Sequence, residues 1–163
     1  MHKTAYLLLG GNIDDRLYFL ERALDMLNNL AGKIKSVSNV YESEPWGFES
    51  SQWFLNQAVE LETNLMPLIL LEKIKLIEKY LGRIRTAEVY QSRTIDIDIV
   101  LYNSAIFNSP ELVIPHPRMT ERMFVLLPMA EIAPDIHHPI YNCSVAYLKE
   151  HCCDMSKINI FKQ

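Results

Sequence analysis

Two aspartates, Asp96 and Asp98, lie in the segment RTIDIDIV at residues 93–100. The alternation of acidic and apolar residues predicts a β-strand, and because side chains alternate faces along a strand, both carboxylates point the same way. Carboxylates about 7 Å apart on one face can converge on a hard cation such as Mg²⁺, which is often held by carboxylates and substrate phosphates together. The alternative is an edge strand with a solvated acidic face.

Arginine residues are concentrated around these aspartates. Five of the seven arginines lie between residues 83 and 122, and this interval contains no lysine. The five are Arg83, Arg85, Arg93, Arg118 and Arg122. A guanidinium group can bind two phosphate oxygens at once in a bidentate contact. Arginines beside a dicarboxylate metal site therefore predict a polyphosphate substrate. Surface salt bridges with Glu88 and Glu111 are the alternative.

His116 lies between two prolines in the segment PHPR at residues 115–118. The prolines restrict the backbone and therefore the direction of the imidazole. A histidine held in this way can donate to a phosphate or accept a proton near neutral pH. A lone histidine is also compatible with simple packing.

Aromatic residues lie in or beside predicted loops, above all the loop at residues 42–52. They are Trp46, Phe48, Trp53, Phe54 and Phe124. Two such rings could stack on the two faces of a flat heterocycle. The amide of Asn56 could bind the edge of that ring, since it offers a donor and an acceptor. Aromatic residues also fill cores, so these side chains alone do not identify a ligand.

The predicted elements that must position these side chains follow the order β-α-β-β-α-β. Strands are predicted at residues 4–9, 33–41, 54–63 and 94–102. Helices are predicted after Asn12, which with Asp15 resembles a capping box, and from Pro67 to Gly82. Further helices are predicted at about residues 120–132 and at 144–151. This order predicts an α+β fold, a ferredoxin-like antiparallel sheet flanked by helices in α-β-α layers. RNA-binding modules and small-molecule sensors share it.

Length and composition limit the class of protein. The chain has 163 residues, enough for one domain, and 49% hydrophobic with 22% charged residues is typical of a globular protein. A formal net charge of -4 argues against electrostatic binding to duplex nucleic acid. Three cysteines without metal-ligand spacing favour a reducing cytoplasm. The apolar run near the first residue is too short for a signal peptide or a membrane span.

Several catalytic motifs are missing from the sequence. The Walker A, G-x-S-x-G, H-E-x-x-H and C-x-x-C patterns do not occur, which excludes P-loop kinases, serine hydrolases, zincins and dithiol enzymes.

Taken in order along nearly the whole chain, the motifs resemble the family of 6-hydroxymethyl-7,8-dihydropterin pyrophosphokinases. The matching segments are LGGN at residues 9–12, YESEPWG at 41–47, FLN at 54–56, GRIR at 82–85, RTIDID at 93–98, PHPR at 115–118, RMF at 122–124 and EIAP at 131–134. The resemblance implies one pterin pyrophosphokinase domain over residues 1–163. It also implies transfer of pyrophosphate from ATP to a pterin alcohol in folate biosynthesis, with AMP as the second product.

The resemblance implies a role for each site residue. Asp96 and Asp98 are expected to bind two Mg²⁺ ions, and Arg83 and Arg93 to stabilise the transferred group. Pterin contacts are expected from Ser43, Trp46, Phe54, Asn56 and Phe124. ATP contacts are expected from Glu78, Arg83, Arg85, Arg93, Ile99, His116 and Arg122. The loops at residues 42–52 and 83–92 resemble segments that close over both substrates. ATP and the pterin are the expected partners of a cytoplasmic monomer that binds neither nucleic acid nor membrane.

The chain departs from the family pattern at Val89, where a basic residue is usual, and at Gln91, where a glycine is usual. Two other function classes stay open. A ferredoxin-like binding module would fit the fold order, although carboxylates occupy the strand face where stacking aromatics are expected. A D-x-D nucleotidyltransferase would instead transfer AMP and release pyrophosphate.

Overall fold

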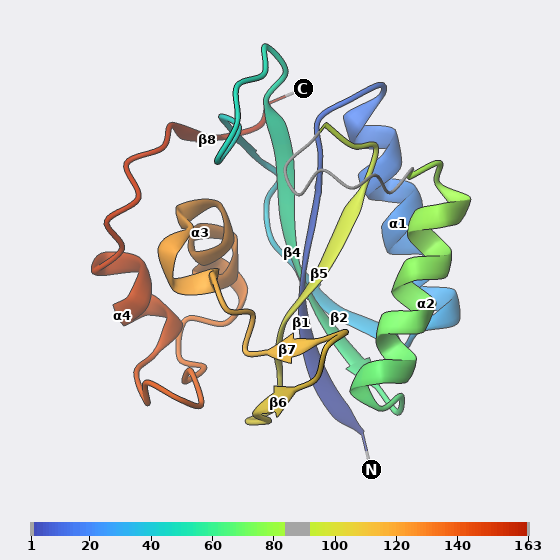
Figure 1. Cartoon of the computed structure of the whole chain (residues 1–163), viewed down its shortest axis with the longest axis vertical. Coiled ribbons are helices and arrows are strands. Elements are labelled where there is room, and N and C mark those ends of the chain that lie inside the picture. The colour runs from blue at the N-terminus through green and yellow to red at the C-terminus, as the bar shows by residue number, and fades with distance from the viewer. Residues whose placement is uncertain (1, 84–91, 163) are drawn as a thin grey trace.

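The computed structural model of the protein describes residues 2–83 and 92–162. Arg85, Val89 and Gln91, which the sequence analysis singled out, lie outside the described residues. Figure 1 shows a twisted sheet with helices on both of its faces. The sheet is formed by β1 (Lys3–Gly11), β2 (Lys33–Val37), β3 (Tyr41–Ser43), β4 (Phe54–Thr63), β5 (Asp96–Tyr102) and β8 (Ile158–Ile160).

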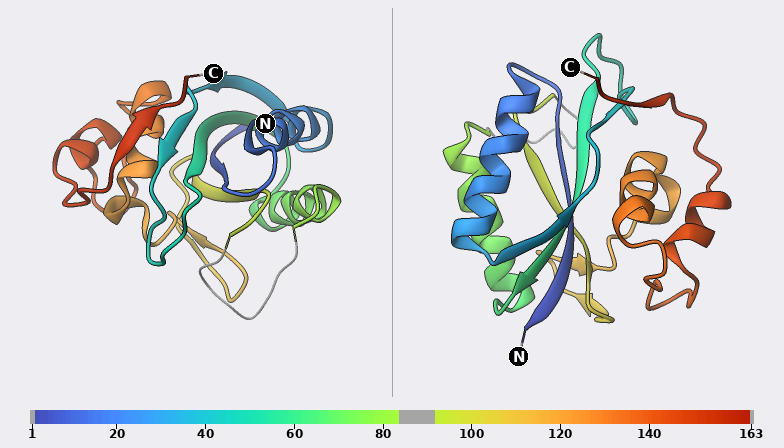
Figure 2. Two further views of the ribbon diagram at one scale, coloured as in Figure 1. Left: turned by 90° about the horizontal axis from the view of Figure 1, so that it is seen from above. Right: turned by 180° about the vertical axis from the view of Figure 1, so that it is seen from behind.

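The order of strands across the sheet is β5-β1-β4-β3-β8, with β2 also paired to β4. Every pair is antiparallel. Helices α1 (Arg16–Leu30) and α2 (Pro67–Tyr80) cover one face, and α3 (Met123–Ile132) and α4 (Val145–Glu150) lie on the other. The two views of Figure 2 show the same three layers. The predicted α+β, ferredoxin-like arrangement is therefore confirmed.

Two apolar clusters hold the layers together, and β1 contributes to both. Leu7 and Leu9 pack under α1 and α2, whereas Tyr6 and Leu8 pack against α3 and its neighbours. Both faces of this strand are buried, as its continuous apolar run predicts. Burial of apolar surface on both sides fixes the central strands, so that the side chains at their ends have defined positions.

The second predicted strand, residues 33–41, is divided into β2 and β3. The hydroxyl of Ser38 accepts a hydrogen bond of 2.9 Å from the N–H of Ala58, and the N–H of Asn39 donates to Glu131 at 2.9 Å. These contacts replace regular strand pairing between the two pieces. Periodicity alone could not show this break, since both partners lie far away in the sequence.

Other boundaries also differ from the predictions. A short 3₁₀ turn at Met119–Glu121 precedes α3, which therefore begins at Met123 and not near residue 120. The hairpin of β6 (Phe107–Asn108) and β7 (Val113–Ile114) was not predicted, and neither was β8. The predicted capping role of Asn12 is wrong, because Asp15 is the N-cap of α1 and accepts from the N–H of Tyr18 at 3.0 Å.

No helix within residues 2–83 and 92–162 is long and apolar enough to cross a membrane.

Candidate active site

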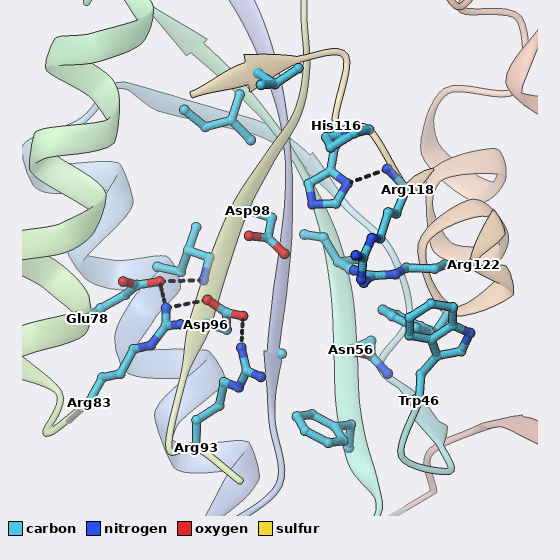
Figure 3. Close-up of a pocket in the computed structure, with 18 of the residues that line it drawn as sticks. Trp46, Asn56, Glu78, Arg83, Arg93, Asp96, Asp98, His116, Arg118 and Arg122 are labelled. Carbon is cyan, nitrogen blue, oxygen red and sulfur yellow. Dashed lines mark hydrogen bonds and ion pairs between the residues drawn. The ribbon is translucent and has the colours of Figure 1, made fainter. Parts of the chain in front are cut away.

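An open cavity of about 550 Å³ lies along β5, between α2 and the start of α3 (Figure 3). Its volume is within the range of small-ligand sites. It is lined by residues that the sequence analysis singled out and that are far apart in the chain. They are Ser43, Trp46, Phe48, Phe54, Asn56, Glu78, Arg83, Arg93, Asp96, Asp98, Ile99, Glu111, His116, Arg118, Arg122 and Phe124. The structure therefore brings to one cavity every described residue to which the resemblance assigns a role, whereas Trp53, one of the candidate aromatic rings, does not line it.

The two aspartates share one face of β5, as the alternation predicts. Ile97 and Ile99 pack in the core under α1 and α2, whereas Asp96 and Asp98 line the cavity on the opposite face. Ile99, a predicted ATP contact, is 3% exposed and also borders the cavity. The same alternation thus serves to anchor the strand and to present two carboxylates.

A row across the sheet connects the acidic end of the cavity with the aromatic end. Gly10 on β1 pairs with Asp96 on one side and with Asn56 on the other. A Cβ atom at residue 10 would lie 3.1 Å from Oδ1 of Asn56, so the amide would have to shift to make room for it. Glycine at this position therefore leaves room above the sheet between the carboxylate and the amide.

Arg83 and Arg93 both contact Asp96 (Figure 3). Each donates from its Nη1 to one carboxylate oxygen of Asp96, and Arg83 also donates to Glu78. Glu78 is 1% exposed and accepts a second hydrogen bond, from the N–H of Ile97 at 2.8 Å. Charge-assisted hydrogen bonds of this kind fix the direction of both guanidinium groups.

Asn12 fixes the backbone that carries Arg93. Its Oδ1 accepts from the N–H of Arg93 at 2.8 Å, and its own N–H donates to the carbonyl of Arg93 at 3.0 Å. Its amide group also donates to the hydroxyl of Ser92 at 3.0 Å. Gly11 permits this approach, because a Cβ there would lie 2.2 Å from the carbonyl oxygen of Thr94. The sequence analysis missed this function, since hydrogen bonds over 80 residues leave no local pattern.

Burial and neighbouring carboxylates act on Asp98. Desolvation, followed by the charges of Asp96 and Glu78, raises the pKa of Asp98 to about 7, although Arg122 and Arg83 oppose the shift. A cation beside Asp98 would stabilise its ionised form. Among the described residues, no three histidine, cysteine or carboxylate side chains form a metal-binding group. A divalent ion held by the two aspartates would therefore need oxygen ligands from a bound phosphate or from water.

His116 faces the cavity as a neutral imidazole. Desolvation, together with the charge of Arg122, lowers the pKa of His116 to about 4, and the nearby Asp96 only partly opposes this. Its Nδ1 accepts from the N–H of Arg118 at 3.2 Å, which leaves Nε2 to carry the proton. His116 is therefore suited to donate a hydrogen bond from Nε2.

Two arginines in the cavity have donors available for an anion. The Nε atoms of Arg83 and Arg122 are buried and, among the described residues, have no hydrogen-bond acceptor. A buried donor without an acceptor is unfavourable, so an anion that accepts from these atoms would be stabilised. Phosphate oxygens fit both the geometry and the charge of guanidinium groups.

The opposite end of the cavity is aromatic. Phe48 contacts Phe54 edge to face, with ring centroids 6.0 Å apart. The guanidinium carbon of Arg122 lies 4.5 Å from the ring centroid of Trp46 and 5.6 Å from that of Phe124. These contacts gather four aromatic side chains at one end of the cavity, beside the guanidinium of Arg122.

Asn56 presents its amide at this end in a fixed direction. Its Nδ2 donates to the hydroxyl of Ser43 at 2.7 Å, and both side chains are buried. A pterin contact is expected from Ser43 on the basis of the sequence. The structure shows that the Ser43 side chain also orients the amide of Asn56, which leaves its Oδ1 directed toward Gly10.

Several further cavity residues were not predicted as part of the site. Leu71 and Lys75 come from α2, and Leu112 and Val113 come from the β6–β7 hairpin. They lie in segments whose sequences indicate only an amphipathic helix and a short connection. The place of Leu112 and Val113 in the cavity depends on the hairpin, which was not predicted.

Comparisons with known proteins identify the family of the chain. A family model described as 7,8-dihydro-6-hydroxymethylpterin-pyrophosphokinase (HPPK) matches residues 6–134. A 2-amino-4-hydroxy-6-hydroxymethyldihydropteridine pyrophosphokinase of Bacillus subtilis is 44% identical over 137 residues, which cover 83% of this chain and 81% of that one. The enzyme of the same name from Aquifex aeolicus is 39% identical over 156 residues, covering 92% and 96% of the two chains.

Longer proteins match as well. The folic acid synthesis protein fol1 of Pneumocystis carinii is 38% identical over 153 residues, which cover 94% of this chain and 20% of that protein. A crystal structure of Plasmodium falciparum HPPK-DHPS with pteroate superposes with a TM-score of 0.77 at 18% identity, covering 92% of this chain. This chain spans only 44% of the length of that protein, and at this identity the superposition shows a common fold.

Proposed function

The chain belongs to the 7,8-dihydro-6-hydroxymethylpterin-pyrophosphokinase family, and from this premise we propose how its cavity performs the reaction. The protein is an ATP-dependent diphosphotransferase of folate biosynthesis, which transfers pyrophosphate from ATP to the hydroxymethyl group of 6-hydroxymethyl-7,8-dihydropterin. One observation carries the assignment of roles. A carboxylate and arginine cluster and an aromatic, amide-bearing end occupy one cavity, with Gly10 between them.

The charged end of the cavity binds the phosphates. Asp96 and Asp98 would hold two Mg²⁺ ions, for which two carboxylates on one face supply suitable hard oxygen ligands. When bound, magnesium neutralises phosphate charge and orients the phosphates for transfer. Arg83 and Arg93 contribute positive charge from fixed positions beside Asp96. A metal held by Asp96 would take part of the contact that this carboxylate makes with the two arginines, and their guanidinium donors would then be available to phosphates.

The nucleoside of ATP extends from the phosphates toward α2 and the β6–β7 hairpin. Leu71, Ile99 and Leu112 give this part of the cavity an apolar lining, and Lys75 adds a donor. His116 donates a hydrogen bond from Nε2 toward the phosphates, and Arg122 reaches them from the start of α3. Glu78 contributes indirectly, because its carboxylate is engaged with Arg83 and with the backbone of β5.

The pterin occupies the aromatic end. Phe54 and Phe124 stack on its two faces, and Asn56 binds its edge through an amide that Ser43 orients. Trp46 borders this end and lies against Arg122, so the loop after β3 contacts an arginine of the phosphate region. This contact favours joint binding of the two substrates.

Transfer proceeds in line. The hydroxymethyl oxygen of the pterin attacks the β-phosphorus, the bond from that phosphorus to the oxygen bridging the α-phosphate breaks, and AMP leaves with that oxygen. The proton of the pterin hydroxyl is released. Positioning of the two substrates and neutralisation of the charge on the transferred group supply most of the rate enhancement. The protein groups that act in this step are Arg83 and Arg93.

We further propose that residues 1–163 form one catalytic domain, which acts as a monomer in the cytoplasm. The three cysteines are free thiols, which fits a reducing compartment. The negative formal net charge gives no support for nucleic acid as a partner.

A product assay tests the reaction. Purified protein is incubated with ATP and 6-hydroxymethyl-7,8-dihydropterin, with and without Mg²⁺, and the nucleotide and pterin products are separated. Equal amounts of AMP and pterin diphosphate, formed only with Mg²⁺, are expected. Release of pyrophosphate would identify a nucleotidyltransferase. Binding of the pterin without any product from folded protein would support a binding module.

A further inference from the structure

We propose that Asp154 is a positioning residue for the pterin end of the cavity, and that it acts through the backbone N–H of Met123. This inference rests on the proposed function. Asp154 lies beyond residues 6–134, the part of the chain that the family model matches. It does not line the cavity, so it would act only through the residues that it holds.

The contact with Met123 supplies a cap that α3 otherwise lacks. The residue at the N-cap position, Arg122, makes no side-chain cap hydrogen bond. Instead, Oδ2 of Asp154 accepts from the N–H of Met123, the first residue of the helix, at 2.9 Å. A carboxylate at a helix N-terminus satisfies an unpaired donor and interacts favourably with the helix dipole. The two neighbours of Met123 are Arg122 and Phe124, which both line the cavity.

The same segment is attached to the other wall of the cavity. Four residues after Asp154, β8 begins at Ile158 and pairs with β3, with Ile158 opposite Ser43. Lys157 extends the connection, because its N–H donates to Oε1 of Glu44 at 3.0 Å and its carbonyl accepts from the N–H of Glu44 at 3.2 Å. Ser43 and Glu44 border the cavity at the start of the loop at residues 42–52, which carries Trp46 and Phe48.

The C-terminal segment therefore connects two walls that come from distant parts of the chain. Figures 1 and 2 show it leaving α4, passing α3 and joining the sheet at β3. One end holds α3 at Met123, and the other end holds β3 at Ser43. Asp154 also accepts at Oδ1 from the N–H of Ser156 at 3.0 Å, which fixes the turn between the two attachments. The separation of Phe124 from Phe54 depends on this connection.

Two substitutions act on the contact. Asp154→Ala removes the acceptor together with its hydrogen bonds to Ser156, whereas Met123→Pro removes only the donor. Proline is well tolerated at the first position of a helix, and Arg122 already has the extended backbone (φ −124°, ψ 108°) that a residue before proline favours. Ser144→Ala is the matched control, because Ser144 caps α4 by accepting from the N–H of Tyr147 at 3.1 Å, and no residue of α4 lines the cavity.

Steady-state kinetics give the first measurement. Asp154→Ala and Met123→Pro are expected to raise the KM for the pterin at least fivefold, with kcat and the KM for ATP changed less than threefold. Because both remove the hydrogen bond between Met123 and Asp154, the double variant should resemble Asp154→Ala and not show the product of the two single effects. Ser144→Ala should lower Tm and leave the pterin KM within twofold. A pterin KM within twofold of wild type in Asp154→Ala, an equal rise in Ser144→Ala, or multiplicative single effects would overturn the proposal.

Hydrogen exchange of the free protein gives a second measurement that does not require activity. Asp154→Ala is expected to speed amide exchange at residues 41–44 and 122–126 but not in α4. Ser144→Ala should speed exchange in α4 and leave residues 41–44 and 122–126 unchanged. Wild-type protein that makes no pterin diphosphate would refute the proposed function and leave this exchange pattern as the test of the connection. Unchanged exchange at both sets of residues in Asp154→Ala would refute the connection itself.

Discussion

Glu78 on α2 accepts a hydrogen bond of 2.8 Å from the backbone N–H of Ile97, the residue between Asp96 and Asp98. The same carboxylate accepts from Arg83. One buried side chain thus holds the strand that presents both aspartates and one of the arginines that face them. Because Glu78 is 1% exposed, neither contact can be replaced by water without rearrangement.

Replacing Glu78 should therefore affect both stability and turnover. Glu78→Ala leaves a buried N–H unpaired and removes one partner of a buried ion pair, which should lower the free energy of unfolding by about 3 kcal/mol. kcat should fall as well, because Arg83 loses one of its two fixed partners. Urea unfolding and steady-state kinetics measure the two effects. Glu72→Ala, at an exposed position of the same helix, serves as the control and should change the unfolding free energy by less than about 0.5 kcal/mol. Equal effects of the two variants would contradict the role of Glu78.

Asp96→Asn and Asp98→Asn should preserve the fold and remove most activity. Each substitution takes one negative charge from the proposed metal ligands and is expected to cost at least ~3–4 kcal/mol of transition-state stabilisation. Initial rates over a range of Mg²⁺ concentrations test this, with Asp135→Asn at an exposed position as the control. Thermal unfolding establishes that the variants are folded. Turnover close to that of wild type in either variant would exclude that aspartate as a metal ligand.

Arg93→Ala should reduce kcat more than it raises the KM for the pterin. The charge that Arg93 meets increases as the pyrophosphoryl group is transferred, so the interaction is stronger in the transition state than in the ground state. Arg93→Lys keeps the charge but loses the planar fork, and kcat is expected to lie between wild type and the alanine variant. An effect restricted to pterin affinity would assign Arg93 to substrate binding alone.

His116 should make the stability of the protein depend on pH in the acidic range. Desolvation and the charge of Arg122 lower the pKa of His116 to about 4, below its ordinary value of about 6.5. The unfolded chain then binds the extra proton first, so the free energy of unfolding falls as the pH decreases from about 6.5 to about 4. In His116→Gln, the free energy of unfolding should fall less steeply between about pH 6.5 and about pH 4 than in wild type. Above pH 7 the pH dependence of the two proteins should be the same. Urea unfolding between pH 4.5 and 7.5 measures the difference, and parallel curves for the two proteins would show that His116 does not titrate in this way.

Several features of the site were determined by the sequence. The alternation in residues 93–100 was sufficient to place Asp96 and Asp98 on one strand face, and the apolar run of β1 predicted a strand buried on both sides. The order of elements predicted the ferredoxin-like sheet. These features depend on periodicity and on short-range backbone preferences, which nearby residues specify.

The tertiary structure determined how distant segments meet. The row from Asp96 through Gly10 to Asn56 depends on the register of three strands, and register is set by hydrogen bonds between segments far apart in the chain. For the same reason, the contact of Asn12 with Arg93 and that of Asp154 with Met123 have no local sequence pattern. Burial then shifts the pKa values of Asp98 and His116, because water is removed from around these side chains only once the layers have packed.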